Sequence, residues 1–195
     1  MIDDELTRSV YKGLCLQQRK EVMDVFPLLL NNIKPKRIIE IGTGCGGLTM
    51  FLRDLLPASS DIFSFEILGR HYHEALKENN INLYYENIFK DRTDWSDFLL
   101  KEEWESIFNI IPKIVICDGG HKRGEFNGLA KYLNKGDIIM LHDYSTDRET
   151  FEALNVWNWL ECEYSEIKTV CESYNLEPFM HKEFLNVAWG CFQKT

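Results

Sequence analysis

One stretch, residues 37–52, constrains the fold of this chain more than any other. It opens with a β-rich apolar run, Arg37–Ile41, whose fourth residue is the acid Glu40. Four glycines then fall within six residues, and an apolar segment with helical spacing follows. The stretch therefore predicts a strand, a glycine turn and a helix. Glycines allow positive φ and the first amides of a helix lack partners, so the turn is a candidate nucleotide cradle.

Two kinds of nucleotide fit this turn. Three of its glycines satisfy the GxGxxG pattern of dinucleotide-binding folds, and Glu66 follows Gly46 by 20 residues, where such folds place an acid for ribose hydroxyls. An NAD site is therefore open on this pattern alone. Glu40 favours a different ligand, because a carboxylate beside the turn repels a pyrophosphate and attracts a cation. S-adenosylmethionine (SAM) carries an ammonium, a sulfonium and a ribose, which suits both acids.

Length and charge limit the possible partners. At 195 residues the chain suits one domain with a substantial core. Its net charge of −9, without a long basic stripe, makes nucleic acid an improbable partner. Only two short groups could form a local basic patch, Lys34, Lys36 and Arg37, or Lys122 and Arg123.

The cysteines and the N-terminus indicate the compartment. None of the six cysteines forms a CxxC pair, which is typical of reduced thiols. The acidic first residues lack the pattern of a signal peptide, and no apolar run approaches membrane-spanning length. We expect a cytoplasmic protein with no membrane association.

Strand-like and helix-like segments alternate along the chain. The expected strands are Arg37–Ile41, Ile62–Ile67, Ile81–Tyr85, Lys113–Asp118 and Ile138–Leu141, with an edge strand around Val187–Phe192. The expected helices are 6–32, broken near Gly13 and interrupted at Pro27, then 71–79, 91–108, 122–133 and 148–160. This order predicts an α/β fold with a doubly wound, mostly parallel sheet and an antiparallel C-terminal edge strand.

No linker divides the chain, so we expect a single domain over residues 1–195. It would comprise an N-terminal helical segment (1–34), a cofactor-binding core (35–144) and a C-terminal helix with edge strands (145–195). Four acids, Glu40, Glu66, Asp118 and Asp143, lie at or just after the ends of expected strands. Because ligands of doubly wound folds bind at the carboxyl ends of the strands, these acids predict the position of the site.

With these residues placed, the chain resembles class I SAM-dependent methyltransferases from about Gly13 to Tyr144. The EIGTGCGG turn is similar to the family's first motif, Glu66 to its ribose-binding acid, and Glu86-Asn87 to the position that contacts adenine, where Asn87 is the better match. The cofactor-binding residues that this resemblance implies are Glu40, Gly42, Thr43, Gly44, Gly46, Gly47, Glu66, Ile67, Asn87 and Asp118.

Two later motifs narrow the resemblance. Asp118-Gly119-Gly120-His121 and Leu141-His142-Asp143-Tyr144 are similar to a subgroup that includes macrocin-type and sugar O-methyltransferases and relatives of the cephalosporin hydroxylase methyltransferase component. Several of these relatives hold a divalent metal. Carried over, the ligands would be Asp118, His142 and Asp143, with Mg²⁺ or another divalent ion. A histidine in place of an acid, and Gly120 where some members have an acid, leave metal binding open.

The implied reaction is O-methylation of a hydroxylated small molecule or sugar. His121 or His142 would act as the base, with Asp143 beside them. Simpler readings compete, because His121 can begin a helix and Trp157 and Trp159 can be packing residues. For Gln17 and Gln18 two positions are open, facing the cofactor cleft or exposed to solvent, and exposed positions are the commoner outcome for such residues.

Two other functions stay open, an NAD-linked oxidoreductase and a SAM-binding subunit without activity. A homodimer through the C-terminal edge strand is compatible with the pattern.

Overall fold

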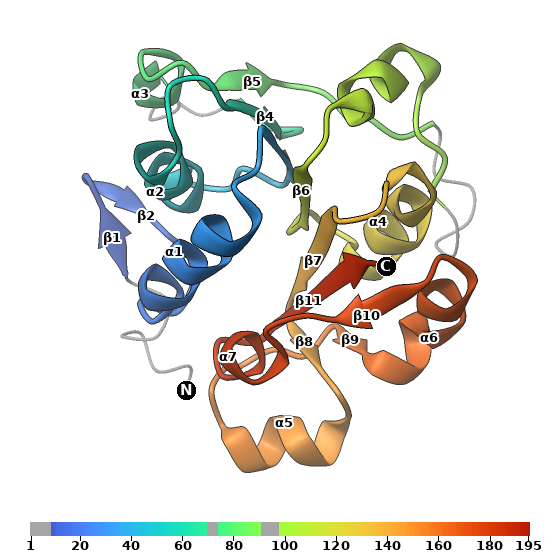
Figure 1. Ribbon diagram of the computed structural model, residues 1–195. Coiled ribbons are helices and arrows are strands. Elements are labelled where there is room, and N and C mark those ends of the chain that lie inside the picture. Colours follow the sequence, from blue (N-terminus) through green and yellow to red (C-terminus); the bar gives the residue numbers. More distant parts are fainter. Residues whose placement is uncertain (1–8, 70–73, 91–97) are drawn as a thin grey trace.

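The computed structural model describes residues 9–69, 74–90 and 98–195. Its centre is a seven-stranded sheet in the order β10-β11-β7-β6-β3-β4-β5 (Figure 1). The strands are β3 (Arg37–Ile41), β4 (Asp61–Phe65), β5 (Asn82–Tyr84), β6 (Lys113–Cys117), β7 (Ile138–His142), β10 (Leu176–Pro178) and β11 (Trp189–Lys194). The expected α/β architecture is confirmed.

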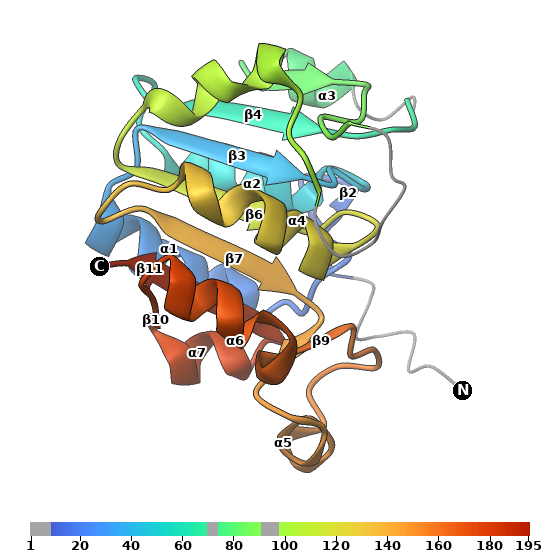
Figure 2. The ribbon, with the colours of Figure 1, turned by 90° about the vertical axis from the view of Figure 1, so that its right-hand side faces the viewer.

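The five strands β3–β7 are parallel to one another. In their register, Arg37 at the start of β3 lies opposite Asp61 of β4 on one side and Lys113 of β6 on the other. The C-terminal antiparallel edge is also present, because β11 pairs antiparallel with both β7 and β10. Strand β11 is therefore antiparallel to the other strands of the sheet, and β10 forms the outer edge. All five parallel strands therefore end on one side of the molecule, toward the right in Figure 2.

Helices cover both faces of the sheet (Figure 2). One face packs against α1 (Val22–Ile33), α2 (Gly47–Leu55) and α7 (His181–Leu185), and the other against α4 (Lys122–Leu129) and α6 (Tyr164–Ser173). Alternate residues of β3 serve the two cores, since Ile38 lies in the first and Ile39 in the second. This alternation is the doubly wound arrangement in which both faces of a parallel sheet are apolar.

The remaining elements are short. They are β1 (Val10–Tyr11), β2 (Leu14–Cys15), α3 (Glu74–Lys77), the 3₁₀ helices Glu102–Asn109 and Ala130–Tyr132, β8 (Tyr144–Ser145), α5 (Arg148–Leu154) and β9 (Cys162–Glu163). Within the described ranges, no helix combines the length and the apolar character needed to cross a membrane.

The N-terminal region differs from expectation. Residues 10–15 form a hairpin instead of the start of a helix, because Lys12 and Gly13 adopt positive φ of 49° and 83° and turn the chain between two apolar pairs. Pro27 does not interrupt α1. It is the sixth of the twelve residues of that helix, which continues to Ile33 although proline offers no amide donor there.

Two predicted helices also differ. The segment expected at 91–108 begins outside the described residues, and its described part is a bridge between Leu100 and Phe89 followed by the 3₁₀ helix. The helix expected at 148–160 stops at Leu154, because Asn155 adopts a left-handed conformation with φ of 46° and ends it. The chain then turns back, which brings Trp157 and Glu161 to the edge of the sheet where the parallel strands end. The helix expected at 71–79 is described only from Glu74.

Candidate active site

A cavity of about 480 Å³ lies at the carboxyl ends of the parallel strands. It is centred on β3 and β6, which are neighbours in the sheet although the chain visits β4 and β5 between them. This crossover is the switch point where doubly wound folds bind ligands. The predicted site residues that line the cavity are Glu40, Gly42, Thr43, Gly44, Glu66, Ile67, Asn87, Asp118, His142 and Asp143.

The glycine turn between β3 and α2 forms one wall. Gly42 and Gly44 have φ of 90° and 54°, and both line the cavity. A side chain on Gly42 is excluded, because a Cβ there would lie 2.2 Å from the backbone oxygen of Asp118. Gly46 and Gly47 do not line the cavity and serve packing instead. A Cβ on them would meet the side chain of Leu76 at 2.7 Å and the backbone oxygen of Cys15 at 2.4 Å.

Glu40 lies beneath this turn and is only 1% exposed. Its Oε2 accepts hydrogen bonds from the hydroxyl of Thr49 at 2.6 Å and from that of Ser64. Burial raises its pKa to about 7, against the lowering effect of these two hydroxyls and with added repulsion from Asp118 and Glu66. The cavity floor therefore carries a carboxylate that lacks a cationic partner among the residues the structure describes.

Glu66 follows β4 and marks the other end of the cavity. Its Oε2 accepts from the amide of Gly44 at 2.9 Å, and its Oε1 accepts from the amides of Ile67 at 2.9 Å and Leu68 at 3.2 Å. Ile67 and Leu68 are largely exposed beside it, and Asn87 lines the same end. The arrangement places a hydrogen-bonding acid between the glycine turn and an apolar rim.

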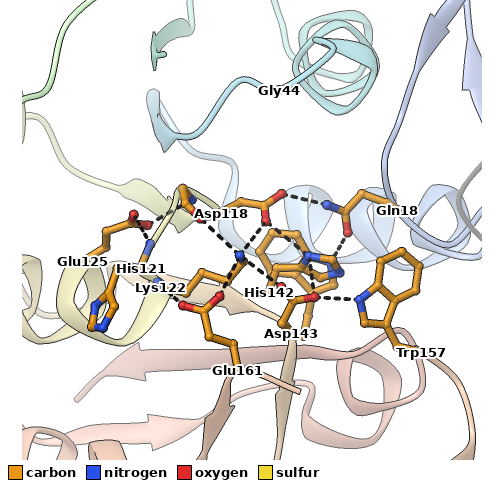
Figure 3. A network of polar contacts seen from close by, with 12 residues as sticks. Gln18, Gly44, Asp118, His121, Lys122, Glu125, His142, Asp143, Trp157 and Glu161 are labelled. Atoms are coloured by element: carbon orange, nitrogen blue, oxygen red, sulfur yellow. Dashed lines mark hydrogen bonds and ion pairs between the residues drawn. The ribbon is translucent and has the colours of Figure 1, made fainter. Parts of the chain in front are cut away.

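A second polar group lies at the ends of β6 and β7, and Figure 3 shows it from close by. Asp118 follows β6, and His142 and Asp143 end β7 and begin the next turn. The Nδ1 of His142 lies 3.2 Å from Oδ1 of Asp118 and 3.3 Å from Oδ1 of Asp143. The structure thus brings together the three residues that the sequence assigned to a metal.

Lys122, from the first turn of α4, lies within this group. Its Nζ is 3.0 Å from Oδ2 of Asp143, 3.0 Å from Oε2 of Glu161 and 4.0 Å from Oδ1 of Asp118. The same ammonium donates to the backbone oxygen of Gly119 at 3.1 Å. Burial alone would lower the pKa of Lys122, but the three carboxylates outweigh it and raise the pKa above its ordinary value. Lys122 is therefore a permanent cation.

His142 is enclosed by aromatic side chains. Its ring lies 5.0 Å from that of Trp157 and 4.8 Å from that of Trp189, and the residue is 3% exposed. Its Nε2 is buried and has no hydrogen-bond partner among the described residues. With Nδ1 directed at two carboxylates and Nε2 covered, this histidine is arranged to hold Asp118 and Asp143 in place.

The structure does not bring His121 into the cavity. His121 caps the N-terminus of α4, where its Nδ1 accepts from the amide of Gly124 at 3.0 Å, and its ring lies 5.4 Å from that of Phe98. Its own amide donates to Glu125 at 3.2 Å. The alternative expectation, that His121 begins a helix, is confirmed. Figure 3 shows its ring directed away from His142.

Three residues of the group were missed or misplaced by the sequence. Gln18 was expected to be exposed but is 1% exposed, and it donates from Nε2 to Oδ2 of Asp118 at 2.7 Å. Trp157 donates from Nε1 to Oδ1 of Asp143 at 2.6 Å, whereas a packing role was the simpler expectation. No sequence motif pointed to Glu161 as a member of this group. Trp159, by contrast, is 65% exposed at the rim of the cavity.

No protein-family profile matches the chain, and no curated protein matches it at a significant level. Solved structures do resemble it. An apo form of CmcI shares 17% identity over 97% of this chain and 77% of that chain, with a TM-score of 0.66. A form of CmcI with Mg and SAM has a TM-score of 0.58 at 16% identity, over 97% and 77% of the two chains.

A third structure comes from Staphylococcus aureus and is provisionally named a caffeoyl-CoA O-methyltransferase. It has a TM-score of 0.61 at 12% identity, over 89% of this chain and 83% of that chain. This chain has a methyltransferase fold. The fold that the sequence resemblance implied is therefore confirmed, and at these identities the likeness concerns the fold alone.

Proposed function

We propose that the protein is a SAM-dependent methyltransferase that methylates a hydroxyl group of a small molecule. The observation that carries the proposal is Glu40, a buried carboxylate at the floor of the cavity directly beneath the glycine turn. A pyrophosphate placed at this turn would face that carboxylate and would be repelled. A ligand with positive charge at one end is attracted.

The rest of the cavity fits the remaining parts of SAM in order. Glu66 can accept from ribose hydroxyls, as acids at this position do in nucleotide-binding α/β folds. Ile67, Leu68 and Asn87 offer an apolar rim and an amide for adenine at the same end. The residues present thus fit SAM along its length, from its ammonium to its base.

SAM, when bound, supplies a methyl group that its sulfonium has already activated. The protein's task is then to align the acceptor oxygen and to take its proton as the new O–CH₃ bond forms and the S–CH₃ bond breaks. Asp143 is the best-placed base, because it lines the cavity and its direction is fixed by Trp157 at Oδ1 and Lys122 at Oδ2. A carboxylate has about four lone-pair sites, so acceptor capacity is left for the proton of the substrate hydroxyl. After transfer, the proton on Asp143 passes to water.

The charge of the cavity also restricts the acceptor. Six acidic residues line it, and Lys122 is the one cation in its described lining. The acids are Glu40, Glu66, Glu86, Asp118, Glu125 and Asp143. An acceptor that carries phosphate or carboxylate groups would be repelled by this excess. We therefore propose a neutral or cationic hydroxylated small molecule.

A cytoplasmic location belongs to the same proposal, supported by six free cysteines, four of them buried. A homodimer through the sheet edge at β10 stays a prediction. An NAD-linked oxidoreductase is the alternative that Glu40 disfavours.

Thermal-shift titration with SAM, S-adenosylhomocysteine and NAD tests the cofactor. A ligand at about a hundred times its Kd stabilises by about 2.7 kcal/mol, which raises the Tm by several degrees. Stabilisation by both sulfur compounds supports the proposal, and stabilisation by NAD alone would overturn it.

Asp143→Asn then separates an enzyme from a subunit that only binds SAM. It should abolish methylation of an acceptor found by screening while SAM affinity stays within about twofold. Asp24→Asn, at an exposed position of α1, is the matched control and should change neither.

A further inference from the structure

The sequence motifs raise the question of a divalent metal, and the geometry of the group at β6 and β7 answers it. Mg²⁺ needs close to octahedral oxygen ligands at 2.0–2.1 Å, and it is usually bound through one or two carboxylates together with several waters. The carboxylate oxygens must therefore face the ion. Within the described residues, no three His, Cys, Asp or Glu side chains are arranged to hold a metal. Asp118, His142 and Asp143 are close together, but their donor atoms face one another and other protein groups.

Both carboxylates are already satisfied by protein donors. Asp118 accepts from Gln18 at 2.7 Å and contacts His142 at 3.2 Å. Asp143 accepts from Trp157 at 2.6 Å and contacts Lys122 at 3.0 Å. A metal ligated by Asp118 and Asp143 would have to break several of these contacts.

Lys122 contacts, through its ammonium, the same carboxylates that would have to ligate such an ion. Its ammonium lies between Asp118, Asp143 and Glu161, as Figure 3 shows, and the residue is 8% exposed. A divalent ion ligated by the same oxygens would lie a few ångströms from this charge, in a buried setting where like charges repel strongly. The ammonium and the metal are therefore mutually exclusive.

We infer that Lys122 takes the place of the divalent metal and that the site works without one. This inference rests on the proposed methyltransferase function. Lys122 is a positioning residue: its single charge offsets part of the negative charge of Asp118, Asp143 and Glu161, and it fixes the direction of Asp143.

Lys122 does not reproduce the metal's other role. A catalytic metal keeps an open coordination position for a substrate oxygen. The three protons of this ammonium instead face Asp143, Glu161 and the backbone oxygen of Gly119. The acceptor hydroxyl is thus not ligated by the cation, and its proton passes directly to a carboxylate.

Mn²⁺ binding, followed by electron paramagnetic resonance, tests the inference without an acceptor. The wild-type protein should not bind Mn²⁺ at this site, and SAM affinity and any methylation should be unaffected by a chelator. Lys122→Ala leaves Asp118, Asp143 and Glu161 without their cation. It should bind Mn²⁺ at least about tenfold more tightly than the wild type, because carboxylate oxygens are the ligands such ions prefer.

The matched control is Lys101→Ala. Lys101 pairs with Glu86 at 3.4 Å, so this change removes the same charge outside the group and should leave Mn²⁺ binding at the wild-type level. Adding Asp143→Asn to Lys122→Ala should abolish the new binding.

Two results would overturn the inference. One is a wild-type protein that binds one Mn²⁺ and loses SAM binding or activity on chelation, a measurement that does not depend on the folding of any variant. The other is a Lys122→Ala variant that binds SAM, and so is folded, yet gains no Mn²⁺. If SAM does not bind the wild-type protein, the proposed function is refuted instead. The experiment therefore distinguishes failure of the proposed function from failure of the inference about Lys122.

Discussion

Replacing Glu40 by glutamine should stabilise the protein above neutral pH and weaken its binding of SAM. Glu40 is buried beneath the glycine turn and ionises at about 7, whereas a glutamate in the unfolded chain ionises near 4.5. Between these pH values the folded protein keeps a proton that the unfolded chain has released. The free energy of unfolding therefore falls as the pH rises through this range, and glutamine removes the loss.

The size of the effect follows from the two pKa values. The loss is below about 1 kcal/mol at pH 5 and reaches about 3 kcal/mol at pH 8, since one pKa unit corresponds to 1.36 kcal/mol. For a chain of this size, that stabilisation raises the Tm by roughly 6–10 °C. SAM affinity at pH 8 should fall at least about tenfold, because the ammonium loses its counter-ion.

Urea denaturation of both proteins at pH 5 and pH 8 measures the difference, and calorimetric titration measures SAM binding. Any misfit of the glutamine amide against Thr49 and Ser64 costs the same at both pH values, so it cancels in the comparison. If Glu40→Gln changes the free energy of unfolding equally at pH 5 and pH 8, then burial does not raise the pKa of Glu40. That result would refute the reasoning.

Three further changes test other parts of the structure. Trp157→Phe removes the hydrogen bond to Asp143, worth about 1.5–3 kcal/mol, so kcat/KM for an identified acceptor should fall about 10- to 100-fold while the SAM Kd stays nearly constant. Lys113→Ala should lower the free energy of unfolding by about 3–5 kcal/mol in urea titrations, because it removes the cationic partner of the fully buried carboxylate of Asp137, and a change below about 1 kcal/mol would contradict this. Gly44→Ala adds a Cβ 2.2 Å from a side-chain oxygen of the N-terminal segment at a φ of 54°, and calorimetry should show SAM affinity reduced several-fold.

The central part of the fold was predictable because its signals are local. The strand Arg37–Ile41 has the bounds expected from its apolar run, and Lys113–Cys117 differs by one residue. In both, β-branched apolar residues dominate and turn residues follow closely. The hairpin at residues 10–15 was missed because strands of two residues are too short to show a period.

The site was predictable only where it follows strand ends. Asp118 and Asp143 were identified because parallel strands bring their ends together, whatever the loops do. Lys122 stands four residues after Asp118, but the direction of its side chain depends on Glu161, 39 residues further along. Trp157 was placed in a helix, and only the left-handed Asn155 brings it back to Asp143. Such long-range contacts have no local signature.

Gln18 joins the two ends of the chain at the centre of the site. Its Oε1 accepts from Nε1 of Trp189 at 3.0 Å while its Nε2 donates to Asp118, so one buried amide spans 171 positions of sequence. Trp189 begins β11, which inserts between β7 and β10 in the sheet. The orientation of this N-terminal amide therefore depends on a strand that begins 171 residues further along the chain. Loss of the Trp189 indole would leave Oε1 of this buried amide without its donor, so a strand near the sheet edge helps to fix the side chain that holds Asp118.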